Sequence, residues 1–260
     1  MTWALRRQLI YISILVLFFG GLGFWISYPY INKPPTCFDN TQNGTEAGVD
    51  CGGSCALACS FQVDKISVTW ARVFKVVHGR FNAVAYLENH NKDTAIYRIK
   101  YKFRFADKDN VYIGKREGET YIPPRGKFAI FEPAIDLGNS VPVFTSFEFT
   151  EEPVWVKVPE EKVNQLNIFV SDIQLKDEDT APKLFATIKN DSFFMIPELK
   201  PIAILYDNLG NAISVSSTYI DLLKGKDSMN ISFTWPEPFQ FKVVTKEVIP
   251  MYDIFSVKLK

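Results

Sequence analysis

The chain has 260 residues, enough for two domains of about 100 residues each after an N-terminal tail. Its 22 phenylalanines and 11 tyrosines favour strands, and it lacks helix-favouring runs rich in Ala, Leu, Glu and Lys. Lysine plus arginine equals aspartate plus glutamate at 29 each, which excludes a global electrostatic field for nucleic acid or an anionic surface.

The first predicted element is an apolar stretch over residues 9–28 that no charged residue interrupts. At a helical rise of about 1.5 Å per residue, it matches the hydrocarbon core of a bilayer, about 30 Å thick. Arg6 and Arg7 precede it, and Trp25 and Tyr28 lie at its far end, where aromatic rings suit the membrane interface. Because arginines favour the cytoplasmic side, we expect a single-pass helix with a cytoplasmic tail over residues 1–8.

A cleaved signal peptide is the alternative, because Gly21 and Gly23 are small residues at a plausible cleavage position. The apolar run continues past these glycines through residues 24–26, which is longer than a usual signal sequence and favours an uncleaved anchor. Under both readings the rest of the chain is exported, either to the cell surface or to the periplasm.

A small module over residues 29–60 contains the four cysteines of the chain, Cys37, Cys51, Cys55 and Cys59. An exported context and an even count predict two disulfides, whose three connectivities the sequence leaves open. The segment has too few apolar residues for a core, so disulfides are expected to hold its shape. Zinc binding by the thiolates is disfavoured, because the compartment is oxidising and neither histidine is nearby.

The module resembles the C-x-D-G-x-x-N-x-x-E-x-x-x-D-C-G-G-x-C motif of many exported surface proteins, although Asn40 replaces its usual glycine. The polar positions of the motif are Asp39, Asn43, Glu46 and Asp50. Their hard oxygen ligands in a small loop suit Ca²⁺, which makes them a candidate calcium site. The alternative is that these residues and the glycines only form turns.

The remainder divides into residues 61–158 and 166–260, joined by a charged segment over residues 159–162. Apolar residues alternate with charged ones over residues 99–105, the period of a half-buried strand. Similar runs are predicted as strands at 62–74, 80–88, 127–134, 143–149, 183–189, 202–206, 211–216, 229–235, 241–248 and 253–259. Short strands without intervening helices predict an all-β fold with two tandem immunoglobulin-like β-sandwiches, arranged as a rod.

The two halves also align with each other. Asn89 corresponds to Asn190 and Gly126 to Gly225, at nearly equal spacings. Asp107 corresponds to Asp207, and each is predicted to begin a hairpin turn. This periodicity favours duplication of one sandwich over a single large barrel.

The second half is similar to the FxLYD-type domains of exported bacterial proteins and to the related desiccation-protein (LEA type 2) sandwich. Residues 186–190, 203–213 and 222–225 carry the resemblance. It implies an immunoglobulin-like fold and an exported location. It implies no enzymatic activity, because those families share none.

No catalytic constellation is predicted. His78 and His90 stand in turn-like segments without neighbouring residues at ligand spacing, and the thiols are expected to be paired. Lys100, Lys102, Arg104, Lys115 and Arg116 could form a basic stripe, but such alternation usually marks the wet side of a sheet.

One apolar segment is a candidate contact loop, with a buried strand edge or an interface plug as the alternative. Its residues are Phe193, Phe194, Met195 and Ile196. We therefore expect a non-catalytic, membrane-anchored interaction or scaffold protein of the cell envelope that binds the membrane through residues 9–28 and a protein partner, but no nucleic acid. The alternative is a surface adhesin or carbohydrate-binding protein with a calcium-stabilised cysteine module.

Overall fold

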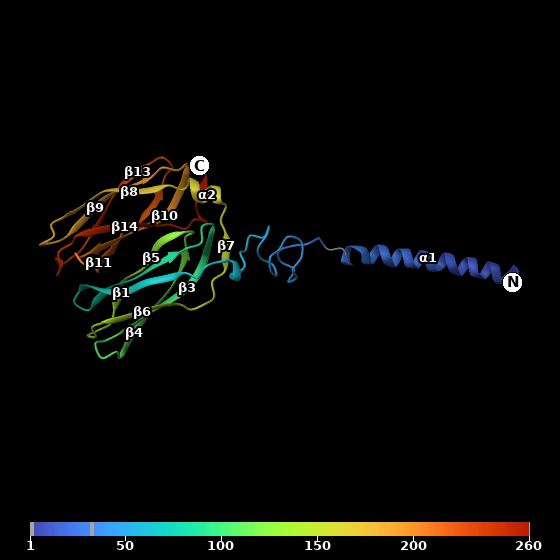
Figure 1. The fold of residues 1–260 in the computed structure, drawn as a ribbon, viewed down its shortest axis with the longest axis horizontal. Helices are drawn as coiled ribbons and strands as arrows, with labels where there is room; N and C mark the ends of the chain where they lie inside the picture. The colour runs from blue at the N-terminus through green and yellow to red at the C-terminus, as the bar shows by residue number, and fades with distance from the viewer. Residues whose placement is uncertain (1–2, 32–33, 260) are drawn as a thin grey trace. The chain divides into compact units, whose positions relative to one another are not determined.

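The computed structural model describes residues 3–31 and 34–259. The chain forms two compact units, Met1–Cys55 and Ala56–Lys260. The first unit contains the helix and most of the cysteine module, and the second contains all the β-sheets (Figure 1).

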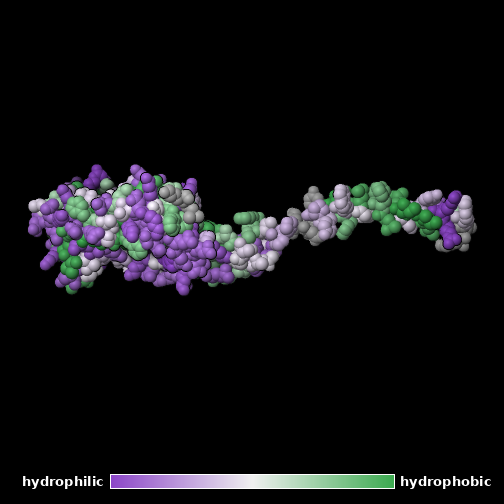
Figure 2. Space-filling view, turned by 90° about the horizontal axis from the view of Figure 1, so that it is seen from above, coloured by the Kyte–Doolittle hydropathy of each residue, from purple (hydrophilic) through white to green (hydrophobic). Residues whose placement is uncertain are grey.

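Helix α1 (Trp3–Ile31) is the only long helix in the described part of the chain. Its span Trp3–Pro29 is long and apolar enough to cross a membrane, and none of it is buried against protein. Figure 2 shows apolar residues along the helix and hydrophilic ones near its N-terminal end. A helix that satisfies its own backbone hydrogen bonds and exposes apolar side chains on every side is suited to lipid. The predicted helix is confirmed, and it begins earlier than residue 9.

The first sandwich consists of two antiparallel sheets. Its strands are β1 (Ser67–Val77), β2 (Arg80–Asn89), β3 (Thr94–Ala106), β4 (Tyr112–Ile122), β5 (Gly126–Asp136), β6 (Phe144–Phe149) and β7 (Trp155–Lys157). One sheet has the order β1-β2-β5, and the other has the order β4-β3-β6 with β7 also paired to β3. The predicted alternation along β3 is confirmed, because Ile99, Tyr101, Phe103 and Phe105 are buried in the core.

The second sandwich follows a short helix, α2 (Glu160–Gln165), which occupies the charged joint. Its strands are β8 (Ile168–Lys176), β9 (Lys183–Asn190), β10 (Phe194–Tyr206), β11 (Ala212–Ser217), β12 (Ile220–Leu223), β13 (Ser228–Thr234), β14 (Thr245–Met251) and β15 (Lys258–Leu259). One sheet has the order β13-β9-β8, and the other is built around β10, which pairs with β11, β12, β14 and β15. This arrangement repeats the strand order of the first sandwich.

A buried asparagine holds the same corner of each sandwich. Asn89 donates hydrogen bonds to the Thr94 carbonyl at 3.0 Å and the Pro123 carbonyl at 2.8 Å. Asn190 donates to the carbonyls of Phe194 at 2.8 Å and Lys224 at 3.1 Å. Each side chain thus ties the end of one strand to the start of the next strand and to a later turn. Both asparagines are fully buried. Their hydrogen bonds therefore satisfy backbone carbonyls that water does not reach.

Turns also correspond between the sandwiches. Asp107 Oδ1 accepts hydrogen bonds from the amides of Asp109 and Val111, both at 2.9 Å, and Asp207 Oδ1 accepts from those of Leu209 and Asn211, both at 2.8 Å. These are self-bonded Asx turns.

The expected match of Gly126 with Gly225 is offset. The equivalent pair is Arg125 and Lys226, because each has positive φ (43° and 58°) and donates its amide to the residue two positions after the buried asparagine. Gly126, which follows Arg125, is therefore equivalent to Asp227, which follows Lys226, and not to Gly225.

The two sandwiches pack face to face, so the expectation of a rod is wrong. Sheet β1-β2-β5 lies against the sheet of β11, β10 and β14, which makes a stack of four layers (Figure 1). Alternate residues of β10 enter different cores: Ile202 and Ile204 join the core of the first sandwich, and Ala203 and Leu205 join that of the second. Both inner sheets are consequently covered on both faces.

A shared carboxylate links the sandwiches across this interface. Glu247 on β14 accepts a hydrogen bond from the hydroxyl of Tyr86 at 2.8 Å and another from that of Tyr206 at 2.6 Å. The Trp70 ring stacks on that of Tyr86 with centroids 5.3 Å apart. Burial, reinforced by the bond to Glu247, raises the pKa of both tyrosines above the ordinary value.

Alkaline pH should destabilise the folded protein through its buried tyrosines. Burial raises the pKa of Tyr252 to about 12. Burial is also the main cause that raises the pKa of Tyr101 and of Tyr121. Their neutral forms persist in the folded state when the unfolded chain begins to ionise near pH 10, so the stabilisation is complete below about pH 10 and falls as pH rises toward 12 and beyond. A spectrophotometric phenolate titration should show delayed ionisation that coincides with unfolding. Ionisation of all tyrosines near pH 10 without unfolding would contradict this.

Several strands depart from expectation. β4, β8 and β12 were not predicted, and residues 253–259 form turns except for β15. The last residues of the cysteine module also join the first sandwich, since Leu57 forms a β-bridge with Val156. Strand pairing across the sandwich, rather than local pattern, settles these assignments.

Candidate functional site

The cysteine module is held by disulfides, as predicted. Cys37 is bonded to Cys55 across a sequence separation of 18, and Cys51 and Cys59 are disulfide-bonded too. Between them the chain forms turns, with positive φ at Asn40 and Asp50 and a Gly48–Cys51 bridge. At Gly53 an added Cβ would lie 1.8 Å from the Thr45 carbonyl oxygen, so only glycine fits there.

The carboxylates of the module bind its own backbone. Asp50 accepts hydrogen bonds from the amides of Asp39 at 2.9 Å and Asn40 at 3.0 Å. Glu46 Oε2 accepts from the amides of Asn43 at 3.2 Å and Asp50 at 3.3 Å. Hydrogen bonds from Thr41 and Asn43 hold the pKa of the Asp39 carboxyl well below its usual range. These bonds support the turn-forming role, and calcium binding by Asp39, Asn43, Glu46 and Asp50 stays a prediction.

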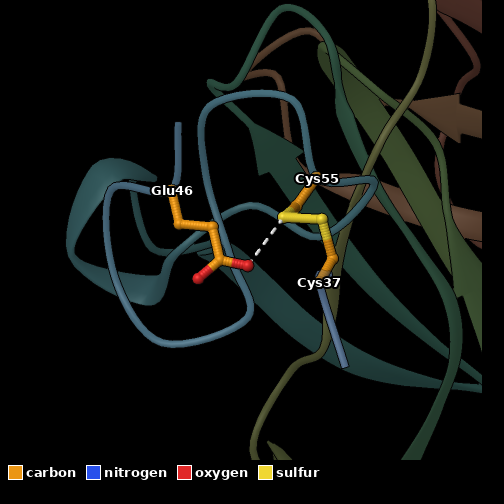
Figure 3. Close-up of side chains that lie close together, drawn as sticks. All are labelled: Cys37, Glu46 and Cys55. Carbon is orange, nitrogen blue, oxygen red and sulfur yellow. Dashed lines mark hydrogen bonds between the residues drawn. A yellow bond between two sulfur atoms is a disulfide. The ribbon is translucent and has the colours of Figure 1, made fainter. Parts of the chain in front are cut away.

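The sulfur atoms beside Glu46 do not make a metal site. Figure 3 shows Glu46 pointing at the Cys37–Cys55 disulfide, with Oε1 lying 3.4 Å from Cys55 Sγ. An oxidised sulfur has neither a proton to donate nor the thiolate charge that metals bind, so this is a close contact rather than a ligand set.

Opening the Cys37–Cys55 bond should unfold the module and spare the sandwiches. For a loop of this length, the Cys37→Ser/Cys55→Ser double variant should lose about 3 kcal/mol of module stability. Hydrogen exchange should show lost protection within residues 38–54 and unchanged protection in β3 and β10. Retained protection in the module would contradict a disulfide-held fold.

The predicted contact loop is not a loop, which is a correction. Phe194 and Ile196 are buried residues of β10, and Met195 is half-buried in the same strand. Only Phe193 projects, with 69% of its surface exposed and Lys226 Nζ 4.7 Å from its ring centroid. Strand pairing with β12 and β15 explains the burial, because the segment begins the central strand of its sheet and contributes to the core of the second sandwich.

The basic residues of β3 and β4 are neutralised by neighbouring carboxylates. Lys102 lies 2.9 Å from Glu148, Lys115 lies 2.8 Å from Glu117, and Arg116 lies 2.7 Å from the buried Glu132. Lys102 and Glu148 form an ordinary cross-strand pair between β3 and β6, whereas Lys115 and Glu117 lie two residues apart on β4. Arg116 on β4 reaches Glu132 on β5 of the other sheet. Each of these three basic residues therefore has an acidic partner, and together they do not form a free basic stripe.

The side chains of Ser67 and His90 lie within hydrogen-bonding distance, which the sequence did not predict. Ser67 Oγ lies 3.0 Å from His90 Nε2, and His90 Nδ1 lies 3.8 Å from Glu88 Oε1. The pairing of β1 with β2 places Ser67 opposite Glu88. Ser67 and His90 are exposed, the second distance is too long for a hydrogen bond, and neither residue lines the cleft around Tyr97 and Tyr219 or the cleft around Val143 and Phe241. The group lacks the enclosed orientation of a catalytic triad.

A cleft of about 730 Å³ lies between the two sandwiches, lined by residues of both. Tyr97, Tyr101 and Tyr121 come from the first sandwich, and Tyr219 comes from the second. Tyr101 is buried and donates to Glu132 at 2.6 Å, whereas 59% of Tyr97 and 51% of Tyr219 are exposed. The sequence held no local signal for this site, because its walls come from strands far apart in the chain.

A bend in β10 forms one wall of the cleft. From Lys200 onward β10 pairs with β14, and from Ile196 to Leu199 it pairs with β12. Within the stretch paired with β12, Glu198 has positive φ (49°), the left-handed conformation that costs a non-glycine residue about 1 kcal/mol or more. The side chain of Glu198 lines the cleft.

The cleft mixes charges of both signs. Arg98 pairs with Glu119 at 2.7 Å, while Glu198 and Lys200 have no ion-pair partner among the described residues. Asp253 accepts hydrogen bonds from the Phe255 amide at 2.9 Å and the Ser256 hydroxyl at 2.6 Å. Burial, and secondly the nearby negative charge of Asp253, raises the pKa of Tyr121. An acidic group of the second sandwich therefore lies close to a phenol of the first.

No protein-family model matches this chain, and no curated protein matches it by sequence. Among solved structures it is similar to red sea bream transglutaminase, at 8% identity and a TM-score of 0.25, over 73% of this chain and 31% of that one. It is also similar to a β-glucuronidase of glycoside hydrolase family 2, at 7% identity and a TM-score of 0.21, over 68% of this chain and 24% of that one. The same holds for Bacteroides uniformis β-glucuronidase, at 15% identity and a TM-score of 0.20, over 68% of this chain and 22% of that one. The chain spans less than a third of these proteins, and likeness at this level carries no argument about function.

Proposed function

We propose that this chain is a non-catalytic, membrane-anchored protein of the cell envelope whose folded units lie outside the cytoplasm and contact a protein partner. The observation that carries the proposal is helix α1, whose span Trp3–Pro29 is long and apolar enough to cross a membrane and is not buried against protein. Disulfide bonding of all four cysteines supports an oxidising compartment. Arg6 and Arg7 at the start of the helix support a cytoplasmic N-terminus.

Matching strand orders and matching asparagine corners support duplication of one FxLYD-like or LEA-2-like sandwich. Sandwiches of this kind bind through loops and sheet edges. Here a cleft of about 550 Å³ in the second unit is lined by the exposed residues Val143 and Phe241, and the exposed Leu209 and Val244 lie in the same loops as its lining residues Asp207, Asn211 and Phe241. We call Val143, Leu209, Phe241 and Val244 the apolar loop end; all are more than half exposed, which is typical of a contact surface when they cluster.

Anchorage and orientation are tested together in intact cells and membranes. The wild-type protein should resist alkaline extraction, should keep residues 1–30 by mass, and should be cut by external protease only after Ile31. The Val16→Arg/Leu17→Arg variant should become extractable, because each arginine at the helix centre costs about 2.5–3.5 kcal/mol of insertion. Val244→Arg, on an exposed loop, is the matched control and should stay anchored. Extraction of the wild-type protein, or loss of residues 1–30, would overturn the proposal.

The partner surface and the absence of catalysis need separate tests. A photo-crosslinking residue at Leu209 should capture a protein in cells, whereas the same residue at the exposed Phe185 on β9 should not. A fluorophosphonate probe should leave Ser67 unlabelled. Labelling of Ser67 that depends on His90 would replace the interaction proposal with a hydrolase.

A second candidate function, a carbohydrate-binding or adhesive surface protein, is favoured by one observation. This is the tyrosine-lined cleft between the sandwiches.

A further inference from the structure

We propose that the cleft between the two sandwiches binds an uncharged oligosaccharide, held by contacts from both. The inference deepens the second candidate function, and it does not depend on how the chain is anchored. At about 730 Å³ the cleft falls within the range of small-molecule sites, about 300–1,000 Å³, and it lies at a domain interface, where such sites are common.

The aromatic lining suits the apolar faces of sugar rings. Tyr97 and Tyr219 present exposed rings from opposite sandwiches, and a tyrosine combines a flat apolar face with a polar hydroxyl. The Tyr97 ring is supported by Phe255, with centroids 5.6 Å apart in an edge-to-face arrangement. A supported ring loses little entropy when a ligand stacks on it.

The polar lining suits hydroxyl groups. Sugar hydroxyls both donate and accept hydrogen bonds, so they need acceptors and donors side by side. Glu198 offers carboxylate oxygens and Lys200 offers ammonium hydrogens, and neither is engaged by an ion pair in the described chain. Thr120, Ser217 and Thr218 add further hydroxyls to the lining. The unusual backbone of Glu198 fits a residue held in place for contact with a ligand.

The balance of charge argues against other ligands. The lining contains the basic residues Arg98 and Lys200 and the acidic residues Glu119, Glu198 and Asp253. A nucleic acid or another polyanion requires a basic surface, which this is not. With Arg98 and Glu119 paired to each other, Lys200, Glu198 and Asp253 leave one positive and two negative charges. This excess of acidic groups disfavours an anionic ligand, whereas an uncharged polyol brings no charge that would have to be buried without a partner.

The test uses the full-length protein in phosphatidylcholine nanodiscs, because maltoside detergents would present sugar headgroups to the cleft. Cellotriose, maltotriose, chitotriose and mannotriose are titrated separately, and binding is followed by saturation-transfer NMR and calorimetry. A hydrophilic tripeptide, Gly-Ser-Gly, is titrated alongside. The variants are Tyr97→Ala, Tyr219→Ala and Glu198→Gln. Tyr112→Ala is the matched control, since Tyr112 is equally exposed on β4 but does not line the cleft.

We expect at least one trisaccharide to bind and the peptide not to bind. Tyr97→Ala and Tyr219→Ala should each weaken affinity at least tenfold, Glu198→Gln severalfold, and Tyr112→Ala not at all, with circular dichroism unchanged. Dependence on residues of both sandwiches identifies the cleft. Absence of binding by all four sugars, equal loss in Tyr112→Ala, or selective binding of the peptide would each overturn the inference. Anchorage and partner capture would stand in every case.

Discussion

Replacing Asn190 with alanine is expected to destabilise the protein by about 3–5 kcal/mol, a large part of the 5–15 kcal/mol available to a typical domain. The side chain is fully buried and donates to two backbone carbonyls, and its Oδ1 accepts from the Ser192 amide at 3.0 Å and the Ser192 hydroxyl at 2.6 Å. Alanine leaves these groups buried without partners, and each such loss costs about 1–3 kcal/mol. Denaturant unfolding of the full-length protein measures the change.

An isosteric variant separates hydrogen bonding from packing. Asn190→Asp keeps the shape but turns the donor nitrogen into an acceptor facing the Phe194 and Lys224 carbonyls, so it should cost at least as much as alanine. Asn230→Asp is the control, because Asn230 is exposed and its Oδ1 only accepts from Thr187 at 3.1 Å; it should change stability by less than about 0.5 kcal/mol. Equal effects at the two positions would show that Asn190 is not a structural corner.

Introducing a carboxylate at Ile204 should separate the sandwiches. Ile204 is fully buried and belongs to the core cluster of the first sandwich, although it lies on a strand of the second. Ile204→Glu puts an unpaired charge into the apolar layer between the sheets, at a cost of several kcal/mol. We expect a larger radius of gyration by small-angle scattering and faster proteolysis between the sandwiches, near α2.

The adjacent residue is a matched comparison. Leu205 is equally buried but joins the second sandwich's own core, so Leu205→Glu should unfold that sandwich instead of opening the interface. Amide exchange distinguishes the outcomes: Ile204→Glu should preserve protection in β9 and β3, whereas Leu205→Glu should lose it in β9. If Ile204→Glu left the scattering profile unchanged, face-to-face packing would be refuted.

Features that depend on residues close together in the chain could be predicted from the sequence. The uninterrupted apolar stretch predicted α1, the clustered cysteines predicted disulfides, and Asp107 and Asp207 predicted turns. The alignment of Asn89 with Asn190 also identified equivalent corners before their contacts were known. Period-two alternation located β3, because one of its faces is dry and the other is wet.

Features that depend on distant residues were decided only by the tertiary structure. β4 and β8 lie at sheet edges, where one side of the backbone is unpaired and polar residues are tolerated, so their patterns were too weak to predict. Residues 201–205 of β10 are buried without alternation because the first sandwich covers their outer face. The cleft has the same origin: burial, charge and ring exposure at Tyr97, Glu198 and Tyr219 are set by how two sheets from opposite halves of the chain meet, and no local pattern encodes that meeting.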